Sequence, residues 1–374
     1  MARSEHFFVV APRTFALTSI LIIALTALWA APTTGTAGVQ VPVTRCDEGS
    51  GNPTRLSPPP LPALITGRVA FYAGLYPPNE RSAKRSVSLG DRHGVFPTAS
   101  MFKTLTVYAL MRGVENREYN LTDRLTTTPD NQSIEAFPSG VNSLQRLSER
   151  AIHNSDNTAN DLLQLAVGPR ELSGLVSSLS RCTTVLLTTK AWWAAQAGLL
   201  PETIGEDTLA GARTYAALPA PERVTAAARI IAESMNIRAK PLEAALETYF
   251  HGSDYTPEVE LLLQNTTTPQ AYADLLARIM PARELTRTRS TFRKIMTTGC
   301  CIPKPSRLTP TYRAAKAGSG WRVLTLSGYL ELANGNRLAY TYMNIESQTL
   351  ESEDMERQIR PINAWIERAI EKLL

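Results

Sequence analysis

Strand-like segments stand near both ends of this 374-residue chain, and helix-like sequence fills the stretch between them. Residues 67–76, GRVAFYAGLY, are largely apolar, and residues 85–91, RSVSLGD, alternate between apolar and polar side chains. The C-terminal part adds three segments of period two, residues 313–320, 322–332 and 336–345. Asn334-Gly335 between the last two is a strong hairpin signal. We therefore predict one α+β domain, whose antiparallel sheet unites the N- and C-terminal segments and packs against a mostly helical middle region.

Helical periodicity marks the region between these strands and the end of the chain. The first predicted helix starts at Pro97, and a later one has Thr268 as its cap and Pro269 at its first position. The last helix starts at about Asp354 and is interrupted, or begins again, at Pro361. Apolar residues at helical spacing predict further helices over residues 143–152, 158–167, 224–235 and 242–249.

The first 37 residues predict export. Arg3 and Arg13 precede the apolar stretch FALTSILIIALTALWAAP, and Gly35 and Ala37 then satisfy the small-x-small rule for signal peptidase. The stretch is close to the length that spans a bilayer, so an uncleaved N-terminal anchor is the alternative. Either interpretation places the rest of the chain outside the cytoplasm, secreted or in the cell envelope.

The remaining chain divides into a linker and a folded domain. Residues 38–64 contain the proline-rich stretch GSGNPTRLSPPPLP, which is typical of a linker, and the domain is expected over residues 65–374. The four cysteines are even in number, so one or two disulfides are expected outside the cytoplasm, with buried free thiols as the alternative. Their pairing cannot be deduced from the sequence. They are Cys46, Cys182, Cys300 and Cys301.

Charge and composition exclude several classes of partner. The net charge of +5 arises from 39 basic and 34 acidic residues, without a dense basic run or interleaved aromatic residues, so we expect no nucleic acid partner. No cluster of His, Cys and carboxylate residues has metal-ligand spacing, so neither a metal nor another cofactor is expected. We expect a monomer that acts on a small-molecule substrate and meets a membrane only through the N-terminal segment.

A serine and a lysine at the start of the first predicted helix suggest nucleophilic chemistry. Ser100 and Lys103 are three residues apart in FPTASMFKTLTVYALM, so both side chains lie on one face of a helix. A serine hydroxyl needs a base, and a lysine serves as one when burial lowers its pKa. A capping serine and a surface lysine are the alternative, because this spacing occurs by chance in a chain of this length.

Two further motifs occur in an order that favours the chemical interpretation. Ser155-Asp156-Asn157 lies at a predicted helix break, and Lys316-Ala317-Gly318-Ser319-Gly320 lies on a C-terminal strand. Together with Ser100-x-x-Lys103 they resemble the three motifs of the class A β-lactamase family of penicillin-recognising serine hydrolases. The stretches LTDRLT, AIHNSDNTANDLL and NTTTPQAYADLLARI add to this resemblance, which runs from about Gly67 to the C-terminus.

The resemblance implies a role for each motif residue. Ser100 would attack the substrate carbonyl, with Lys103 as its base or as an electrostatic partner of the base. The backbone N–H groups of Ser100 and Ser319 would bind the oxyanion, and Gly318 would let the substrate approach the strand. Ser155 would pass a proton to the leaving nitrogen.

Three residues beside these would bind the substrate or fix the site. Asn157 would bind the substrate's side-chain amide, and Lys316 would attract its carboxylate. We expect Asp156 to fix the loop rather than touch substrate.

Two departures from the family pattern bear on activity. Ala317 stands where the family has a threonine that binds the substrate carboxylate, and losing such a hydrogen bond costs about 1.5 to 3 kcal/mol unless Ser319 or Arg322 compensates. The family's water-activating glutamate also has no counterpart in a Glu-x-x-Leu-Asn pattern. The region that would hold it is longer than usual, through an inserted pair of helices at about 200–262. Candidate carboxylates are Glu202, Glu206, Asp207, Glu258 and Glu260.

The sequence therefore predicts an exported serine hydrolase, a divergent class A β-lactamase that opens β-lactam amides through an acyl-serine intermediate and so confers antibiotic resistance. A D-alanyl-D-alanine carboxypeptidase, or another amidase or esterase of peptidoglycan-like amides on the same fold, is the first alternative. The second is a cell-envelope binding protein that has lost turnover.

Overall fold

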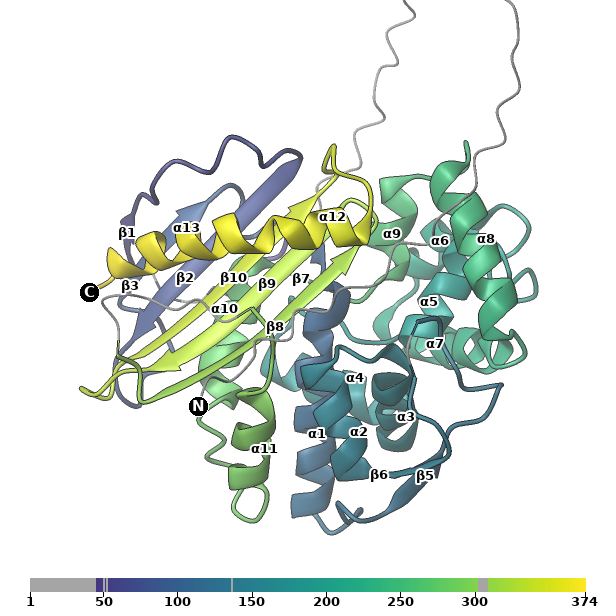
Figure 1. Cartoon of the computed structure of the whole chain (residues 1–374), viewed down its shortest axis with the longest axis horizontal. Helices are drawn as coiled ribbons and strands as arrows, with labels where there is room; N and C mark the ends of the chain where they lie inside the picture. The colour runs from purple at the N-terminus through teal and green to yellow at the C-terminus, as the bar shows by residue number, and fades with distance from the viewer. Residues whose placement is uncertain (1–44, 50, 52, 136, 302–308) are drawn as a thin grey trace, which may run out of the picture. The chain divides into compact units, whose positions relative to one another are not determined.

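The computed structural model describes residues 45–374, apart from 50, 52, 136 and 302–308. Its centre is a six-stranded sheet in the order β1-β3-β2-β10-β9-β8 (Figure 1). Segments from both ends of the chain meet where β2 pairs antiparallel with β10. The predicted α+β fold is therefore confirmed. The strands span Thr54–Leu56 (β1), Arg68–Tyr76 (β2), Arg85–Leu89 (β3), Tyr312–Gly320 (β8), Val323–Glu331 (β9) and Arg337–Ile345 (β10).

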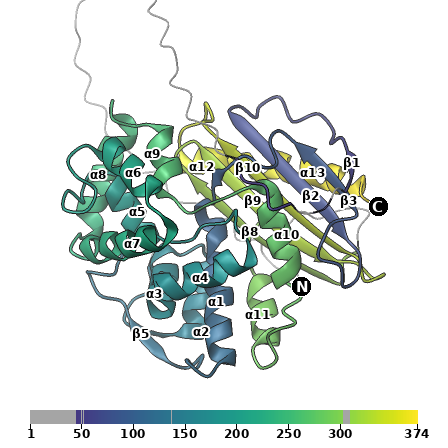
Figure 2. The ribbon, with the colours of Figure 1, turned by 180° about the vertical axis from the view of Figure 1, so that it is seen from behind.

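Helices cover both faces of this sheet. The C-terminal helix α13, Ile359–Glu371, crosses one face (Figure 1), and α10, Pro269–Ile279, lies on the opposite face (Figure 2). Successive residues of a strand point to opposite faces. Accordingly Phe71 contacts Trp365 of α13, with ring centroids 4.8 Å apart, whereas Tyr72 joins the hydrophobic cluster on the other side. Both residues are buried, so the sheet is the middle layer of the domain.

The helical region lies at one end of the sheet, beside β8. Helix α1 is buried at its centre, because eleven of its thirteen residues are removed from solvent. The other helices here pack around it directly or through one another. The helices span Lys103–Glu115 (α1), Leu144–His153 (α2), Asn157–Val167 (α3), Pro169–Leu179 (α4), Thr189–Gln196 (α5) and Arg289–Met296 (α11).

The region expected to hold an inserted pair of helices contains four. Figure 1 shows them grouped at the side of the helical region. Helix α5 packs against three of them, and α6 packs against α9. They span Thr208–Ala217 (α6), Ala220–Ser234 (α7), Ala239–His251 (α8) and Pro257–Leu263 (α9).

Local signals in the sequence locate several boundaries. Thr268 caps α10 by accepting a hydrogen bond from the Ala271 N–H at 3.2 Å, and Pro269 is its first residue. The β9–β10 hairpin turns at Gly335, whose φ of +80° lies in the left-handed region that favours glycine. The C-terminal helix is broken at Gln358, between α12 (Ser352–Arg357) and α13, and Pro361 lies in the first turn of α13.

Part of the expected linker belongs to the domain instead. Within 38–64, β1 pairs in parallel with β3 at the edge of the sheet. Cys46 forms a disulfide with Cys182, and the carbonyl of Pro59 accepts a hydrogen bond from the indole N–H of Trp365 at 2.9 Å. The proline-rich composition predicted a linker, but these three contacts hold the described part of the segment to the domain.

The predicted leader, 1–37, lies outside the described residues. Within the described part of the chain, the helices are too short or too polar to cross a bilayer.

Candidate active site

Ser100 stands at a sharp turn before the central helix. It belongs to the short 3-10 helix η1, Ala99–Phe102, which leads directly into α1. Ala99 has a φ of +42°, which is costly for a residue with a side chain and typical of functional turns. Thr98 fixes the start of this turn, since both its N–H and its hydroxyl bond the carbonyl of Asn265 at 2.8 and 3.0 Å. Ser100 itself stays partly accessible.

Two short sheets support the loops around this turn. Strand β4, Phe96–Pro97, pairs with β7, Thr266–Thr267, just before η1. Strand β5, Arg124–Thr126, pairs with β6, Val141–Ser143, at the base of a loop that reaches the site.

Lys103 is completely buried one turn after Ser100. Its ammonium donates to Asn157 Oδ1 at 2.6 Å, to Ser155 Oγ at 3.2 Å and to the Ser155 carbonyl. Burial, and then repulsion from the charge of Lys316, lower the pKa of Lys103 from 10.5 to about 7. A lysine with this pKa is partly neutral at physiological pH, as a general base must be.

The Ser155 turn is shaped by the aspartate that follows it. Ser155 has a left-handed φ of +55°. Asp156 caps α3 by accepting from the Ala159 N–H at 2.8 Å, and it forms an ion pair with Arg150 at 2.6 Å. With both oxygens engaged, Asp156 fixes the turn, while Ser155 and Asn157 on either side of it contact Lys103.

Lys316 reaches the same hydroxyl from the edge of the sheet. Its ammonium, buried on β8, donates to Ser155 Oγ at 2.8 Å and to the Ala317 carbonyl at 2.5 Å. Burial lowers the pKa of Lys316 as well. The three segments that the sequence singled out therefore converge, because Ser155 Oγ accepts hydrogen bonds from both Lys103 and Lys316.

Gly318 brings β8 against Ser100. A Cβ built on Gly318 would lie 2.3 Å from the backbone nitrogen of Ser100, 2.8 Å from Ala99 Cβ and 2.9 Å from Thr325 Oγ1. Only glycine allows this close approach. The N–H of Ser100 therefore lies directly beside the strand on which Ser319 follows.

The residues that could compensate for Ala317 are otherwise engaged. The side chain of Ala317 is buried in the cluster beneath α13. Ser319 donates to Glu356 of α12 at 2.6 Å. The guanidinium of Arg322 donates to the carbonyls of residues 346 and 347, at 3.1 and 2.6 Å. In this structure neither side chain replaces the hydroxyl that the family provides.

Glu135 is a carboxylate of the site that the sequence analysis did not find. It lies in the loop between β5 and β6 and accepts a hydrogen bond from Asn157 Nδ2 at 2.8 Å. Burial raises the pKa of Glu135, and the charge of Lys103 opposes this effect. Its left-handed φ of +68° belongs to an irregular loop, for which sequence periodicity gives no signal.

The five carboxylates proposed from the sequence are placed elsewhere. None of their hydrogen bonds among the described residues reaches Lys103, Ser155 or Asn157. Glu258 pairs with Arg213 at 2.7 Å, and Asp207 caps α6. Glu202 and Glu206 are exposed. Glu260 is buried, which raises its pKa to about 8, and Arg322 is the cation that stabilises its charge.

The segment before α5 is held by another carboxylate. Asp161 of α3 accepts the N–H groups of Thr189 and Lys190 at 2.8 and 2.9 Å. The side chain of Lys190 donates to the carbonyl of Asp130 at 2.5 Å.

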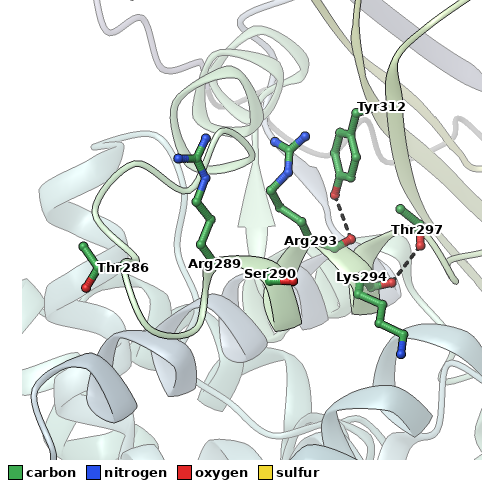
Figure 3. A pocket seen from close by; sticks show the side chains of 7 residues that line it. All are labelled: Thr286, Arg289, Ser290, Arg293, Lys294, Thr297 and Tyr312. Carbon is green, nitrogen blue, oxygen red and sulfur yellow. Dashed lines mark hydrogen bonds between the residues drawn. The ribbon is translucent and has the colours of Figure 1, made fainter.

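A hollow of about 510 Å³ lies apart from this constellation. Figure 3 shows that α11 and the first residue of β8 line it. Arg293, one of its cations, is paired with Glu331 at 2.8 Å and stacks 3.6 Å from the ring centre of Tyr312. None of the predicted site residues lines this hollow. Across the described residues, His, Cys, Asp and Glu do not gather in groups of three or more that could hold a metal.

Comparison with known proteins found a matching sequence family. A sequence model described as the β-lactamase enzyme family matches residues 84–360. A comparison with curated proteins gave no match.

Solved structures share the fold at low sequence identity. A mutant of the class A β-lactamase of the last common ancestor of Gram-negative bacteria is 18% identical, with a TM-score of 0.52 over 82% of this chain and 93% of that one. A β-lactamase from Burkholderia vietnamiensis is 16% identical, with a TM-score of 0.52 over 81% and 91%. A mutant of PBP-A, in an acyl-enzyme complex with penicillin G, is 18% identical, with a TM-score of 0.50 over 82% and 91%.

Proposed function

Because this chain belongs to the β-lactamase enzyme family, we propose that it is an exported serine hydrolase that opens β-lactam amides through an acyl-serine intermediate at Ser100. The observation that carries this proposal is the environment of Lys103. Its side chain is buried one turn from the partly accessible Ser100, and its pKa is about 7. Burying a lysine costs free energy, and strongly perturbed pKa values cluster at functional sites.

Acylation begins with the neutral form of Lys103. The amine takes the proton of Ser100 as Oγ attacks the carbonyl carbon, and the carbonyl π electrons move to oxygen. We assign the stabilisation of this oxyanion to the backbone N–H groups of Ser100 and Ser319, since Gly318 brings the two segments together.

The leaving nitrogen is then protonated through Ser155. This hydroxyl is hydrogen-bonded to both lysines, so it can give its proton to the ring nitrogen and recover one from Lys103. The C–N bond breaks, and the acyl group remains on Ser100. Lys316 holds positive charge beside Ser155, which favours a substrate with a carboxylate.

Release of the acyl group needs an activated water. Glu135 is the carboxylate that joins the network of Lys103 and Asn157, and we assign the activation of water to it. If this carboxylate does not activate water, the protein acylates and stalls. That behaviour is the second candidate function, of the penicillin-binding type, and it is favoured because two of the five expected carboxylates are engaged elsewhere, Glu258 with Arg213 and Asp207 as the cap of α6.

Intact mass spectrometry with benzylpenicillin and a chromogenic cephalosporin assay test both functions. We expect a transient mass increase equal to the penicillin, together with cephalosporin turnover. Ser100→Ala should abolish both, whereas Ser177→Ala, on the exposed face of α4, should change neither. Glu135→Gln should convert the transient acyl-enzyme into a persistent one. A wild-type protein that never gains mass would refute the proposal, and one that gains mass permanently would favour the second candidate.

A further inference from the structure

Two adjacent cysteines lie at the edge of the candidate active site. Cys300 and Cys301 follow α11 and are free thiols, whereas Cys46 and Cys182, the other cysteines of the chain, form a disulfide. The family-based assignment of the site does not use this pair. Cys300 is exposed, and Cys301 packs against the hydrophobic cluster beneath α13.

Backbone contacts hold this pair against β8. A Cβ on Gly299 would lie 1.8 Å from the carbonyl oxygen of Ala315, so the chain here touches the strand directly. The Cys300 sulfur lies beside the backbone of Ala317, which stabilises its negative charge. The carbonyl of Cys301 accepts a hydrogen bond from Asn363 at 3.0 Å. The first thiol is therefore fixed beside Lys316, and the second beside the C-terminal helix.

The two sulfurs differ in their proton affinity. The neighbouring Cys301 thiol, and then the charge of Lys316, lower the pKa of Cys300 to about 6. The neighbouring Cys300 sulfur raises the pKa of Cys301. Glu356 also faces the pair and disfavours negative charge on it. At neutral pH the arrangement combines an exposed thiolate with a protonated partner thiol, as oxidation followed by resolution requires.

We propose that Cys300 and Cys301 form a peroxide-sensitive modification site that changes the charge beside Lys316. The Cys300 thiolate attacks one oxygen of hydrogen peroxide; the O–O bond breaks, hydroxide leaves and the sulfur becomes a sulfenic acid. The Cys301 sulfur then attacks the Cys300 sulfur. The S–O bond breaks, an S–S bond forms, and the oxygen leaves as water with the Cys301 proton. Sulfur loses two electrons in total, and peroxide gains them.

The resulting disulfide is easily reversed. Adjacent Cα atoms are about 3.8 Å apart, whereas disulfides favour about 4.4 to 6.8 Å, so a bond between neighbouring cysteines is strained. Strained, exposed disulfides have high reduction potentials and are the labile ones. This site is therefore suited to a reversible change rather than to structural support.

The charge change has a consequence that rests on the proposed function. The reduced site places a thiolate beside Lys316, where it competes with a substrate carboxylate. The disulfide carries no charge. Oxidation should therefore raise the acylation rate with an anionic penicillin on the order of tenfold, the effect of one nearby unit charge in a partly solvated cleft.

Mass spectrometry tests the site without any substrate. Protein with Cys46–Cys182 intact is treated with one equivalent of hydrogen peroxide, then alkylated and weighed. The wild type should lose two hydrogen atoms and accept no alkyl group. Cys301→Ser should retain a sulfenic acid at Cys300 that dimedone labels, and Cys300→Ser should keep an unoxidised thiol over the same time. Two alkylatable thiols after peroxide, or equally fast oxidation of Cys300→Ser, would overturn the proposal.

Acylation rates test the consequence separately. The double variant Cys300→Ser/Cys301→Ser should acylate at the rate of the oxidised wild type, and peroxide should not change this rate. Equal rates for oxidised and reduced wild type would overturn the link to Lys316. If no form acylates, the proposed function fails, while the mass experiment still decides whether the modification site exists.

Discussion

The pH dependence of acylation follows from the burial of Lys103. With a pKa of about 7, the amine is about one tenth neutral at pH 6, half neutral at pH 7 and about nine tenths neutral at pH 8. The acylation rate should therefore rise about tenfold from pH 6 to pH 8 and then level off. A lysine with its ordinary pKa of 10.5 would instead give a rate that still rises about tenfold per pH unit at pH 9.

Two variants should move this profile in opposite directions. The Lys316 ammonium repels that of Lys103 and lowers its pKa, so Lys316→Gln should move the midpoint to higher pH. The Glu135 carboxylate attracts the ammonium and raises the pKa, so Glu135→Gln should move the midpoint to lower pH. Lys294→Gln, an exposed lysine on α11, is the control and should leave the midpoint unchanged.

Stopped-flow acylation with saturating penicillin measures these midpoints. The midpoint, not the amplitude, is compared, because Lys316→Gln also weakens binding of an anionic substrate. The reasoning is refuted if the wild-type rate shows no plateau below pH 9. It is equally refuted if both variants move the midpoint in the same direction.

Three further predictions concern packing and stability. Gly318→Ala should reduce the acylation rate at least a hundredfold, because the new Cβ would lie 2.3 Å from the backbone nitrogen of Ser100. Gly320→Ala is the control and should acylate at the wild-type rate, because the nearest atom to its Cβ would be 4.0 Å away. The Cys46–Cys182 disulfide closes a loop of 136 residues. Its reduction should lower the free energy of unfolding by about 5 kcal/mol in urea titrations. An unchanged urea concentration at the midpoint of unfolding would contradict this. Lys103→Met should be more stable than wild type at pH 6, and this advantage should shrink by about 3 kcal/mol at pH 9. Between pH 7 and pH 9 the lysine is protonated in the unfolded state but largely neutral in the folded state, so the stability of the wild type rises with pH. A difference in unfolding free energy that stays constant with pH in denaturant melts would argue against a low pKa of Lys103.

The sheet was predictable because its strands carry their own signals. The alternation in 336–345 and the turn at Asn334-Gly335 depend only on neighbouring residues, and β9 and β10 pair as expected. The cap of α10 at Thr268 is local in the same sense. The segment at 45–64 was missed because its position depends on distant partners. Cys46 pairs with a residue 136 positions away, and β1 adds in parallel to β3, for which composition gives no indication.

The site divides in the same way. Ser100 and Lys103 are close because of helical spacing, and Ser155 and Asn157 flank a residue that caps the next helix. Glu135 reaches Asn157 from an irregular loop, so its place follows from loop conformation and not from a pattern. Family resemblance predicted the carboxylate in the long segment before Thr266. In this chain two acidic residues of that segment, Glu258 and Glu260 of α9, interact with Arg213 and Arg322 instead.

The hydrogen bonds of Lys103 also bear on how this proposed base would become able to accept a proton. An ammonium has three donors, and Lys103 uses three acceptors, namely Asn157 Oδ1, the Ser155 carbonyl and Ser155 Oγ. The protonated form is therefore saturated and has no lone pair for the hydroxyl of Ser100. Loss of one proton must break or reverse one of these bonds. The bond to Ser155 Oγ, at 3.2 Å, is the longest, and a hydroxyl can donate as well as accept, whereas a carbonyl cannot. Lys316 holds Ser155 Oγ at 2.8 Å, so this serine keeps its place when its bond from Lys103 is lost, and the lone pair of the neutral amine is left for the hydroxyl of Ser100. In the proposed mechanism the proton taken from Ser100 then passes through Ser155 to the leaving nitrogen, which links the titration of Lys103 to both halves of the acylation step.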